Sequence, residues 1–538
     1  MTFRINLVVL IVGAFFTSAQ ALANDRNSLA IVGVSIANPN GFELAEDATV
    51  LIDGDTIVEI GPRKRVKPPK GADVIDGRGK WLIPGLMELH AHFGFGGGVL
   101  FGQYEKGRPQ PPKELMQGGV KSGGLDALLL DQYSFEAKLR ALLRAGVTTV
   151  RSTGENDWAY SGSFEQRARA EREPMAPRYL RSTPLLWPRP DNPGDGRITT
   201  PEQGREAVRF FDEERDVDLL KIWFVDGKFS GEDDGPETYL ELMPVVEAML
   251  DEAKKRGMEN GVDAIEVWRA KEVIKAGGNL VHGIFFGDVD DEYISLMKEY
   301  DVDQVWTAIA SERYFGAVAG HLRFVTPEYL MSDPHVIAHL IDIRHDNPDK
   351  LVIPSGGSRF DGLTLTQAMK EPPYTEEITT VVANLRRAYE ARLPMGMGTD
   401  VGIVGIPYGA ALFAEFEHYL AAGMSPRDVL TAATINNAHI INMADTLGSI
   451  TEGKKADLVL LNANPLQDIM NAAEISGVVR NGHYFSASEL NNDTPNDVVT
   501  RLRNAYNGGD KAAIFQLLHE NVIFIGGSDI DTVEGREA

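Results

Sequence analysis

The chain has 538 residues, more than one ordinary domain holds, although an α/β barrel can take up most of that length. Its net charge of −25 argues against nucleic-acid binding, which needs clustered lysine and arginine. The sequence contains no cysteine, which excludes disulfides, thiolate metal ligands and cysteine nucleophiles together. Any bound metal must therefore be held by histidine, aspartate, glutamate or a modified lysine.

Residues 1–23 have the pattern of a secretory signal peptide. Arg4 supplies a positive charge, residues 6–16 form an apolar run too short to span a bilayer, and Ala21-Leu22-Ala23 is a small-x-small cleavage site. No later segment is long and apolar enough to span. We expect a secreted or periplasmic protein without stable membrane insertion after cleavage; an uncleaved membrane anchor is the less favoured alternative.

Two separated stretches are rich in short strand signals. Residues 28–84 contain several, including a pair that flanks a hairpin-like turn at Gly54-Asp55. The same texture returns within residues 446–488. We predict that both stretches build one composite β-sandwich domain.

Between them, residues 85–445 alternate apolar strands with helical stretches. Strands are expected at residues 146–150, 217–222, 279–282 and 351–354, and helices at residues 244–256 and 266–276. This repeat predicts an α/β fold in which a (β/α)8 TIM-like barrel is inserted into the sandwich. In such barrels the chemistry lies at the C-terminal ends of the strands.

Two segments interrupt this organisation. Residues 93–124 are rich in glycine and proline, which predicts a long loop over the first strand, either a lid or a disordered insertion. Residues 493–538 resemble the start of a nuclear-transport-factor-2-like (NTF2-like) α+β domain but are short for that family, so we predict a partial α+β segment.

The sequence His90-Ala91-His92 ends an apolar strand, and the period of two points both imidazoles the same way. Two neutral imidazoles are half of a metal site, although two solvated histidines are the plainer alternative. Lys221 lies in an apolar strand, where burial lowers the pKa of an amine; the alternative is a side chain that reaches solvent. His282 ends another strand and is a further candidate ligand; the plainer alternative is a histidine packed in the core. Asp400 follows a Gly-Thr pair and is also a candidate ligand; the alternative is that it caps the N-terminus of a following helix.

Four motifs carry a family resemblance: residues 82–92, 145–151, 398–402 and 448–459. With them the chain resembles the metal-dependent amidohydrolase superfamily, in its imidazolonepropionase-like and prolidase-like branch, over about residues 28–490. The motifs are specific for the superfamily and weak for the substrate.

The resemblance implies a metal-ligand set. His90 and His92 would bind a first, more buried ion together with Asp400, which would also take the proton from the attacking water. Lys221, as a carbamate, would bridge to a second ion bound by His282. The family histidine of the fifth strand is replaced by Asp263, so the second ion is expected to be weak, different or absent.

These residues predict an exported hydrolase that cleaves a carbon–nitrogen bond of a small molecule with one or two divalent ions, zinc being favoured. The resemblance implies dipeptides, N-acyl amino acids or a cyclic amide as substrates. One alternative is a lactonase or esterase that uses the same site. Another is a metal- or ligand-binding protein with impaired catalysis, suggested by Asp263. The sequence leaves homo-oligomerisation open.

Overall fold

The computed structural model describes residues 28–39, 45–93, 135–154, 166–183, 185–188, 197–214, 217–224, 236–283, 287–310, 312–313, 375–403 and 406–491. The predicted signal peptide, the 351–354 strand, nearly all of the 93–124 loop and the 493–538 segment lie outside the described residues. No helix in the described ranges has both the length and the apolar character needed to cross a bilayer.

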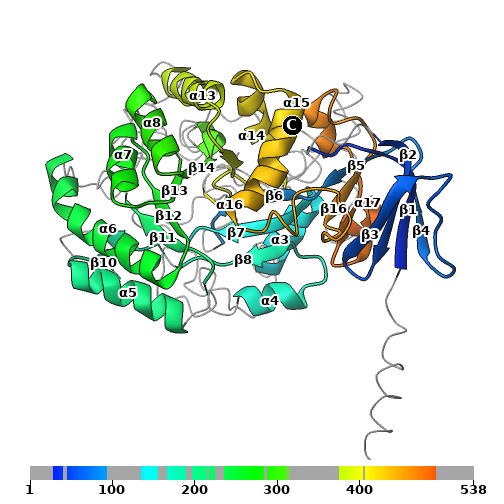
Figure 1. Cartoon of the computed structure of the whole chain (residues 1–538), viewed down its shortest axis with the longest axis horizontal. Coiled ribbons are helices and arrows are strands. Elements are labelled where there is room, and N and C mark those ends of the chain that lie inside the picture. Colours follow the sequence, from blue (N-terminus) through cyan, green and yellow to red (C-terminus); the bar gives the residue numbers. More distant parts are fainter. Residues whose placement is uncertain are drawn as a thin grey trace, which may run out of the picture.

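One mixed sheet takes strands from both β-rich stretches and lies at one end of the molecule (Figure 1). Its order is β18–β17–β16–β5–β1–β2–β3, with β4 paired to β1. The strands are β1 (Ser28–Ile36), β2 (Ala45–Asp53), β3 (Thr56–Pro62), β4 (Asp73–Asp76), β5 (Trp81–Pro84), β16 (Leu458–Leu461), β17 (Ile475–Arg480) and β18 (His483–Ser486). The two stretches meet where β16 pairs antiparallel with β5, Leu458 opposite Pro84.

The middle of the chain contributes parallel strands in two sheets. The first has the order β6–β7–β8 and the second the order β11–β12–β13–β14–β15. The strands are β6 (Leu86–Ala91), β7 (Val147–Ser152), β8 (Arg178–Leu180), β11 (Leu220–Trp223), β12 (Asn260–Asp263), β13 (Leu280–His282), β14 (Asp303–Trp306) and β15 (Met395–Met397). A small parallel pair, β9 (Trp187–Pro188) and β10 (Arg197–Ile198), lies beside them. Parallel bridges from Ser182 to Leu219 and from Ala91 to Val401 connect the two larger sheets at both edges.

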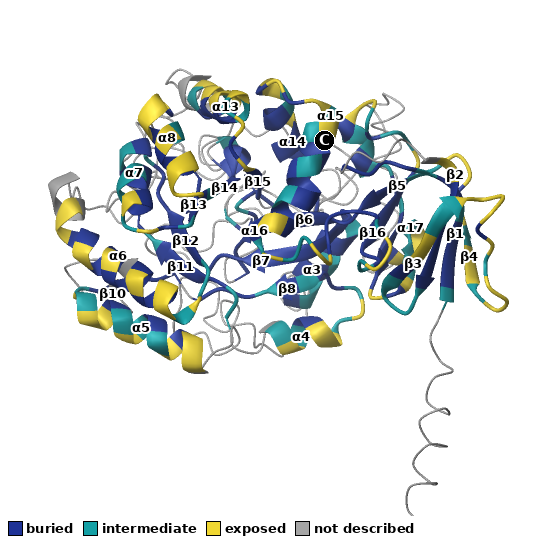
Figure 2. Ribbon diagram, in the orientation of Figure 1, coloured by how far each residue is buried: buried dark blue, intermediate teal, exposed yellow. Residues whose placement is uncertain are grey.

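Helices lie around the parallel strands, and most of them turn one face to solvent (Figure 2). They are α3 (Phe135–Arg144), α4 (Gln166–Arg172), α5 (Pro201–Glu214), α6 (Pro236–Arg256), α7 (Val267–Lys275), α8 (Asp291–Glu299), α13 (Thr375–Glu390), α14 (Ala411–Ala421), α15 (Pro426–Thr431), α16 (Asn437–Ile440) and α17 (Ala487–Asn491), with the π-helix η3 (Ala432–Asn436) and the 3₁₀ helix η4 (Ile469–Ala473). The helix expected to begin at Pro244 begins eight residues earlier, so Pro244 lies inside α6 and that start was wrong. The α7 prediction differs by one residue at each end.

A buried amide fastens the first parallel strand to the last. Asn437 Nδ2 donates to the carbonyl oxygens of Met87 in β6 and Met397 in β15, both at 2.9 Å. Its Oδ1 accepts the backbone N–H of Met397 at 2.9 Å. The strand that ends in the His-x-His motif and the strand that precedes Asp400 are thereby held at a fixed spacing.

Candidate metal centre

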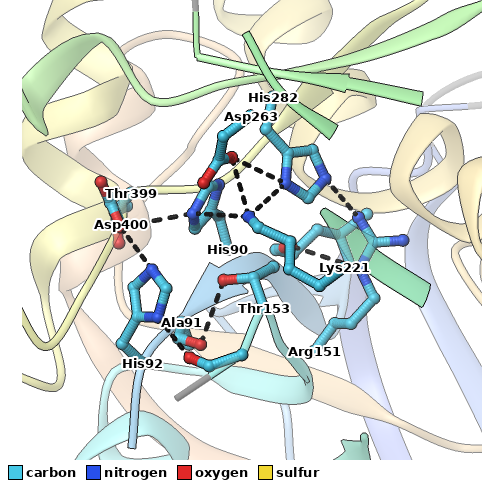
Figure 3. Close-up of polar contacts among 12 residues, drawn as sticks. His90, Ala91, His92, Arg151, Thr153, Lys221, Asp263, His282, Thr399 and Asp400 are labelled. Carbon is cyan, nitrogen blue, oxygen red and sulfur yellow. Dashed lines mark hydrogen bonds and ion pairs between the residues drawn. The ribbon is translucent and has the colours of Figure 1, made fainter. Parts of the chain in front are cut away.

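The six residues predicted to form the site converge on one another, five of them near or just beyond the C-terminal ends of parallel strands and Lys221 within a strand (Figure 3). His90 lies in β6 and His92 follows it, while Lys221 lies in β11. Asp263 and His282 are the last residues of the adjacent strands β12 and β13, which pair them directly. Asp400 follows β15 by three residues. Their ligand atoms form two groups that share His90.

The first group contains His90, His92 and Asp400. Asp400 Oδ1 lies 3.3 Å from His90 Nε2 and 3.0 Å from His92 Nε2. This buried oxygen has no hydrogen-bond donor among the described residues. His92 Nδ1 lies 2.6 Å from the carbonyl oxygen of Gly154, which can only accept, so Nδ1 carries the proton and the Nε2 lone pair is turned toward Asp400. Two imidazole nitrogens and a carboxylate oxygen converge as a donor set that fits a divalent ion.

The second group contains His90, Asp263 and His282, with Lys221 between them. Lys221 Nζ lies 2.8 Å from Asp263 Oδ1, 3.0 Å from His282 Nδ1 and 3.5 Å from His90 Nε2. The lysine is 0% exposed, so the alternative in which its amine reaches solvent is wrong. Asp263, which the resemblance predicts in place of the family histidine, thus lies among the other predicted ligands.

Burial controls the protonation of the nitrogen groups. It lowers the pKa of His90 and of His282 well below the usual histidine value, and the nearby Lys221 charge acts in the same direction. Burial also lowers the pKa of Lys221, against the raising effect of Asp263. Neutral imidazole is the form that binds a metal, and a neutral amine is the form that reacts with carbon dioxide.

Comparisons with known proteins point to one family. The Amidohydrolase family model matches residues 338–484. Imidazolonepropionase from Geobacillus thermodenitrificans (strain NG80-2) is 26% identical over 456 residues, covering 80% of this chain and 87% of that protein. The homologous enzyme from Geobacillus kaustophilus (strain HTA426) is 25% identical, covering 79% and 86%.

Solved structures extend the likeness to the fold. A Xaa-Pro dipeptidase with methionine bound in its active site superposes with a TM-score of 0.64 at 21% identity, covering 86% of this chain and 100% of that one. A putative prolidase from Bifidobacterium longum gives a TM-score of 0.58 at 22% identity, covering 85% and 94%.

The chain matches the Amidohydrolase family model and is similar to imidazolonepropionases over most of its length, which supports the amidohydrolase superfamily. Its relatives place it in the imidazolonepropionase-like and prolidase-like branch, which confirms the resemblance, and it is a hydrolase that acts on carbon–nitrogen bonds. The structural likenesses imply a TIM-barrel catalytic domain with a β-sandwich domain, in agreement with the mixed α/β class.

Two side chains that support the amidohydrolase site were not assigned a role from the sequence. The buried Glu88 carboxyl accepts the backbone N–H of His90 at 2.8 Å and both the N–H and Oγ1–H of Thr399, at 3.0 and 2.7 Å. Burial raises the pKa of Glu88 to about 8. Arg151, at the end of β7, places Nη2 3.3 Å from His282 Nε2. Both residues lie inside the family motifs, and that position was the available signal.

Two side chains donate hydrogen bonds to the backbone at the end of the His-x-His motif. Tyr408 Oη–H donates to the carbonyl oxygen of His92, and Lys138 Nζ donates to that of Phe93 at 2.7 Å. The Phe93 ring is buried and packs edge-on against Phe135 at 5.2 Å. The predicted loop therefore cannot begin at Phe93, which is a core residue of the amidohydrolase domain.

Asp400 adopts a left-handed backbone conformation with φ of +63°, which favours Gly, Asn and Asp. It precedes bridge and turn residues rather than a helix, so the N-cap alternative is wrong. The conformation is held from both sides, because Glu88 binds the preceding Thr399 and Val401 bridges to Ala91. Such backbone strain persists where surrounding contacts enforce it, commonly at functional sites.

Proposed function

We propose that this protein is an exported, metal-dependent amidohydrolase that hydrolyses a carbon–nitrogen bond of a small molecule. The observation that carries the proposal is the approach of His90 Nε2 and His92 Nε2 to Asp400 Oδ1. This oxygen has no hydrogen-bond donor among the described residues. A divalent ion, for which we propose zinc, lowers the pKa of water to roughly 7 and polarises a substrate carbonyl.

The chain's own residues then have separate roles. His90, His92 and Asp400 would hold the first ion. Asp400 also accepts the proton of the attacking water and passes it to the leaving nitrogen, the task of a general base followed by a general acid. Lys221, as a carbamate, would hold a second ion together with Asp263 and His282. The buried amine among these groups supports that modification.

We also propose that the parallel strands close into a (β/α)8 barrel inserted in the β-sandwich, which the bridges at both sheet edges support. The signal-like pattern of residues 1–23 supports export to a periplasm. The relatives are named imidazolonepropionase and Xaa-Pro dipeptidase, so a cyclic amide, a dipeptide or an N-acyl amino acid is the proposed substrate. Export favours the scavenging of peptides.

The test is a hydrolysis screen of the purified mature protein against dipeptides, N-acyl amino acids, cyclic amides, lactones and esters. We expect cleavage of an amide that chelation abolishes and Zn²⁺, Mn²⁺ or Co²⁺ restores. His90→Ala should remove the activity, whereas His439→Ala, at an exposed position on α16, should keep it. Cleavage of lactones alone would replace the proposal with a lactonase. Metal binding without any hydrolysis product would favour the alternative of a metal-binding protein with impaired catalysis. The ion pair between Lys221 and Asp263 supports that alternative.

A further inference from the structure

His92 and His282 differ in what contacts the ring nitrogen that points away from the other predicted ligands. For His92 that contact is the Gly154 carbonyl, an acceptor, which leaves the other nitrogen unprotonated and turned to the site. For His282 it is Arg151 Nη2, 3.3 Å from Nε2, and a guanidinium can only donate. Metal-binding histidines ordinarily give this outer N–H to an acceptor. His282 therefore has the inverse arrangement.

The inversion has a consequence for the ring proton of His282. A neutral imidazole carries one N–H, and if Nε2 accepts from Arg151 the proton resides on Nδ1. On that side of the ring, Nδ1 faces the acceptor Asp263 Oδ1 at 3.5 Å. The nitrogen that faces Lys221 and Asp263 is then protonated, and the lone pair that a metal needs points at Arg151.

Arg151 is held firmly in this position. It is 3% exposed, and its Nε donates to the Leu89 carbonyl oxygen at 3.3 Å, one residue before His90. Its guanidinium charge lies beside the second group of ligands, where it repels a second cation. The hydrogen bond and the charge thus act in the same direction.

We propose that Arg151 is a positioning residue that sets the metal stoichiometry of this chain. By turning the His282 lone pair away from Asp263 and placing a positive charge beside it, Arg151 keeps the second ion weakly held while the first remains tight. The proposal rests on the proposed function, because it assumes an ion at His90, His92 and Asp400. It predicts a protein that retains one ion through purification and exchanges the other.

Lys221 defines the competing arrangement. Its Nζ lies 3.0 Å from His282 Nδ1, so an ammonium there would require the Nδ1 lone pair. Nε2 would then carry the proton and face the N–H groups of Arg151, and no hydrogen bond would join the two. The tautomer of His282 in the metal-free protein distinguishes these arrangements.

The experiment combines ¹⁵N NMR of the histidine rings in the metal-free protein with zinc binding by equilibrium dialysis. Arg151→Met removes both the donor and the charge, and Arg151→Gln keeps a donor without the charge. Arg480→Met is the matched control, because Arg480 is also buried but pairs with Asp457 in the composite sheet. The His282 signals are assigned by their loss in His282→Asn.

We expect the Nδ1–H tautomer in the parent chain, one tight zinc ion and one weak one. Arg151→Met should bind the second zinc at least tenfold more tightly with the first unchanged, Arg151→Gln should lie between, and Arg480→Met should match the parent. An Nε2–H tautomer in the parent, or unchanged or weaker second-site binding in Arg151→Gln, would overturn the inference even if Arg151→Met fails to fold. Absence of zinc from the first site of the parent would instead reject the proposed function.

Discussion

At the scale of residues, the candidate site consists of six predicted ligands and two buried side chains, Glu88 and Arg151, that contact them. His90, His92, Lys221, His282 and Asp400 have recognisable types at strand ends, and the structure brings them together with Asp263, while their binding of metal stays a prediction. Glu88 and Arg151 act through contacts that join distant strands. No local pattern encodes such contacts, because a buried carboxyl or guanidinium has the same sequence signature whatever it touches.

Lys221 offers the first residue-scale prediction. Lys221→Ala should lose the second ion and lower turnover. Removing a residue that only hydrogen-bonds to a metal ligand costs roughly 10- to 100-fold in activity, and we expect a larger loss here. The reason is that the carbamate and its bridging oxygens disappear. Short carboxylic acids should partly restore the rate, and mass spectrometry or diffraction should find the carbamate in the parent. An unmodified Lys221 with metal bound at neutral pH would contradict this.

Asp263 offers the second residue-scale prediction. Its carboxylate is a harder ligand than imidazole and carries a full charge, so the second site should prefer Mn²⁺ or Mg²⁺ over Zn²⁺. Asp263→His should raise zinc occupancy toward two per chain and increase turnover on a good substrate, whereas Asp263→Ala should lower second-metal occupancy. Metal analysis of both variants checks this. If both matched the parent in metal content and rate, Asp263 would not be a ligand.

At the scale of elements, the expected strands that fall within the described residues were recovered, as was the helix α7, and errors fall where tertiary contacts decide. The apolar pattern around Pro244 does not reveal that α6 continues through it, and the glycine-rich texture after Phe93 hides its packing against Phe135. The π-helix η3 packs against β6 and β15. Immediately after it, Asn437 turns its amide onto both β6 and β15.

Replacement of Asn437 tests that fastening. Asn437→Ala removes the amide that bonds the Met397 N–H and the Met87 and Met397 carbonyl oxygens, and one unsatisfied buried group costs about 1–3 kcal/mol. We expect the free energy of unfolding to fall by about 3 kcal/mol or more in denaturant titrations. Asn436→Ala is the control, since its side chain makes one hydrogen bond, to Met395, and should cost about 1 kcal/mol. Equal losses in both variants would argue against the fastening role.

Glu415 predicts a pH dependence for the contact between α14 and the segment after β14. It accepts the N–H groups of Ala308 and Ile309, both at 2.8 Å, and burial raises its pKa to about 7. A carboxyl whose folded-state pKa is raised stabilises the fold below its unfolded pKa, and that stabilisation is lost as pH rises through 7. The neighbouring His418 opposes this shift and Glu312 adds to it.

The measurement is the free energy of unfolding of the parent and Glu415→Gln between pH 4.5 and 8. The parent should lose stability relative to the variant across this window, by up to about 3 kcal/mol. The Glu415 charge also raises the pKa of His418, so the difference between the two proteins reports the titration of this coupled pair. Parallel profiles would show that Glu415 does not titrate in this range.

At the scale of the whole molecule, the composite sheet joins strands that are nearly 400 residues apart in the chain. β5 pairs with β16, and Asn38 Nδ2 donates to the Ile450 carbonyl oxygen at 2.9 Å. The two β-rich stretches could be recognised from their texture, but texture does not encode which strand pairs with which or in what register. The domain limits, the export signal and the C-terminal segment remain predictions.

The central claim is a metal site at His90, His92 and Asp400. Its most direct test is anomalous diffraction at the zinc edge from crystals of the purified mature protein, soaked in and out of zinc. We predict an anomalous peak within bonding distance of His90 Nε2, His92 Nε2 and Asp400 Oδ1 that chelation removes along with hydrolytic activity. A folded, zinc-soaked protein without a peak there, whose hydrolysis is indifferent to chelation, would contradict the account.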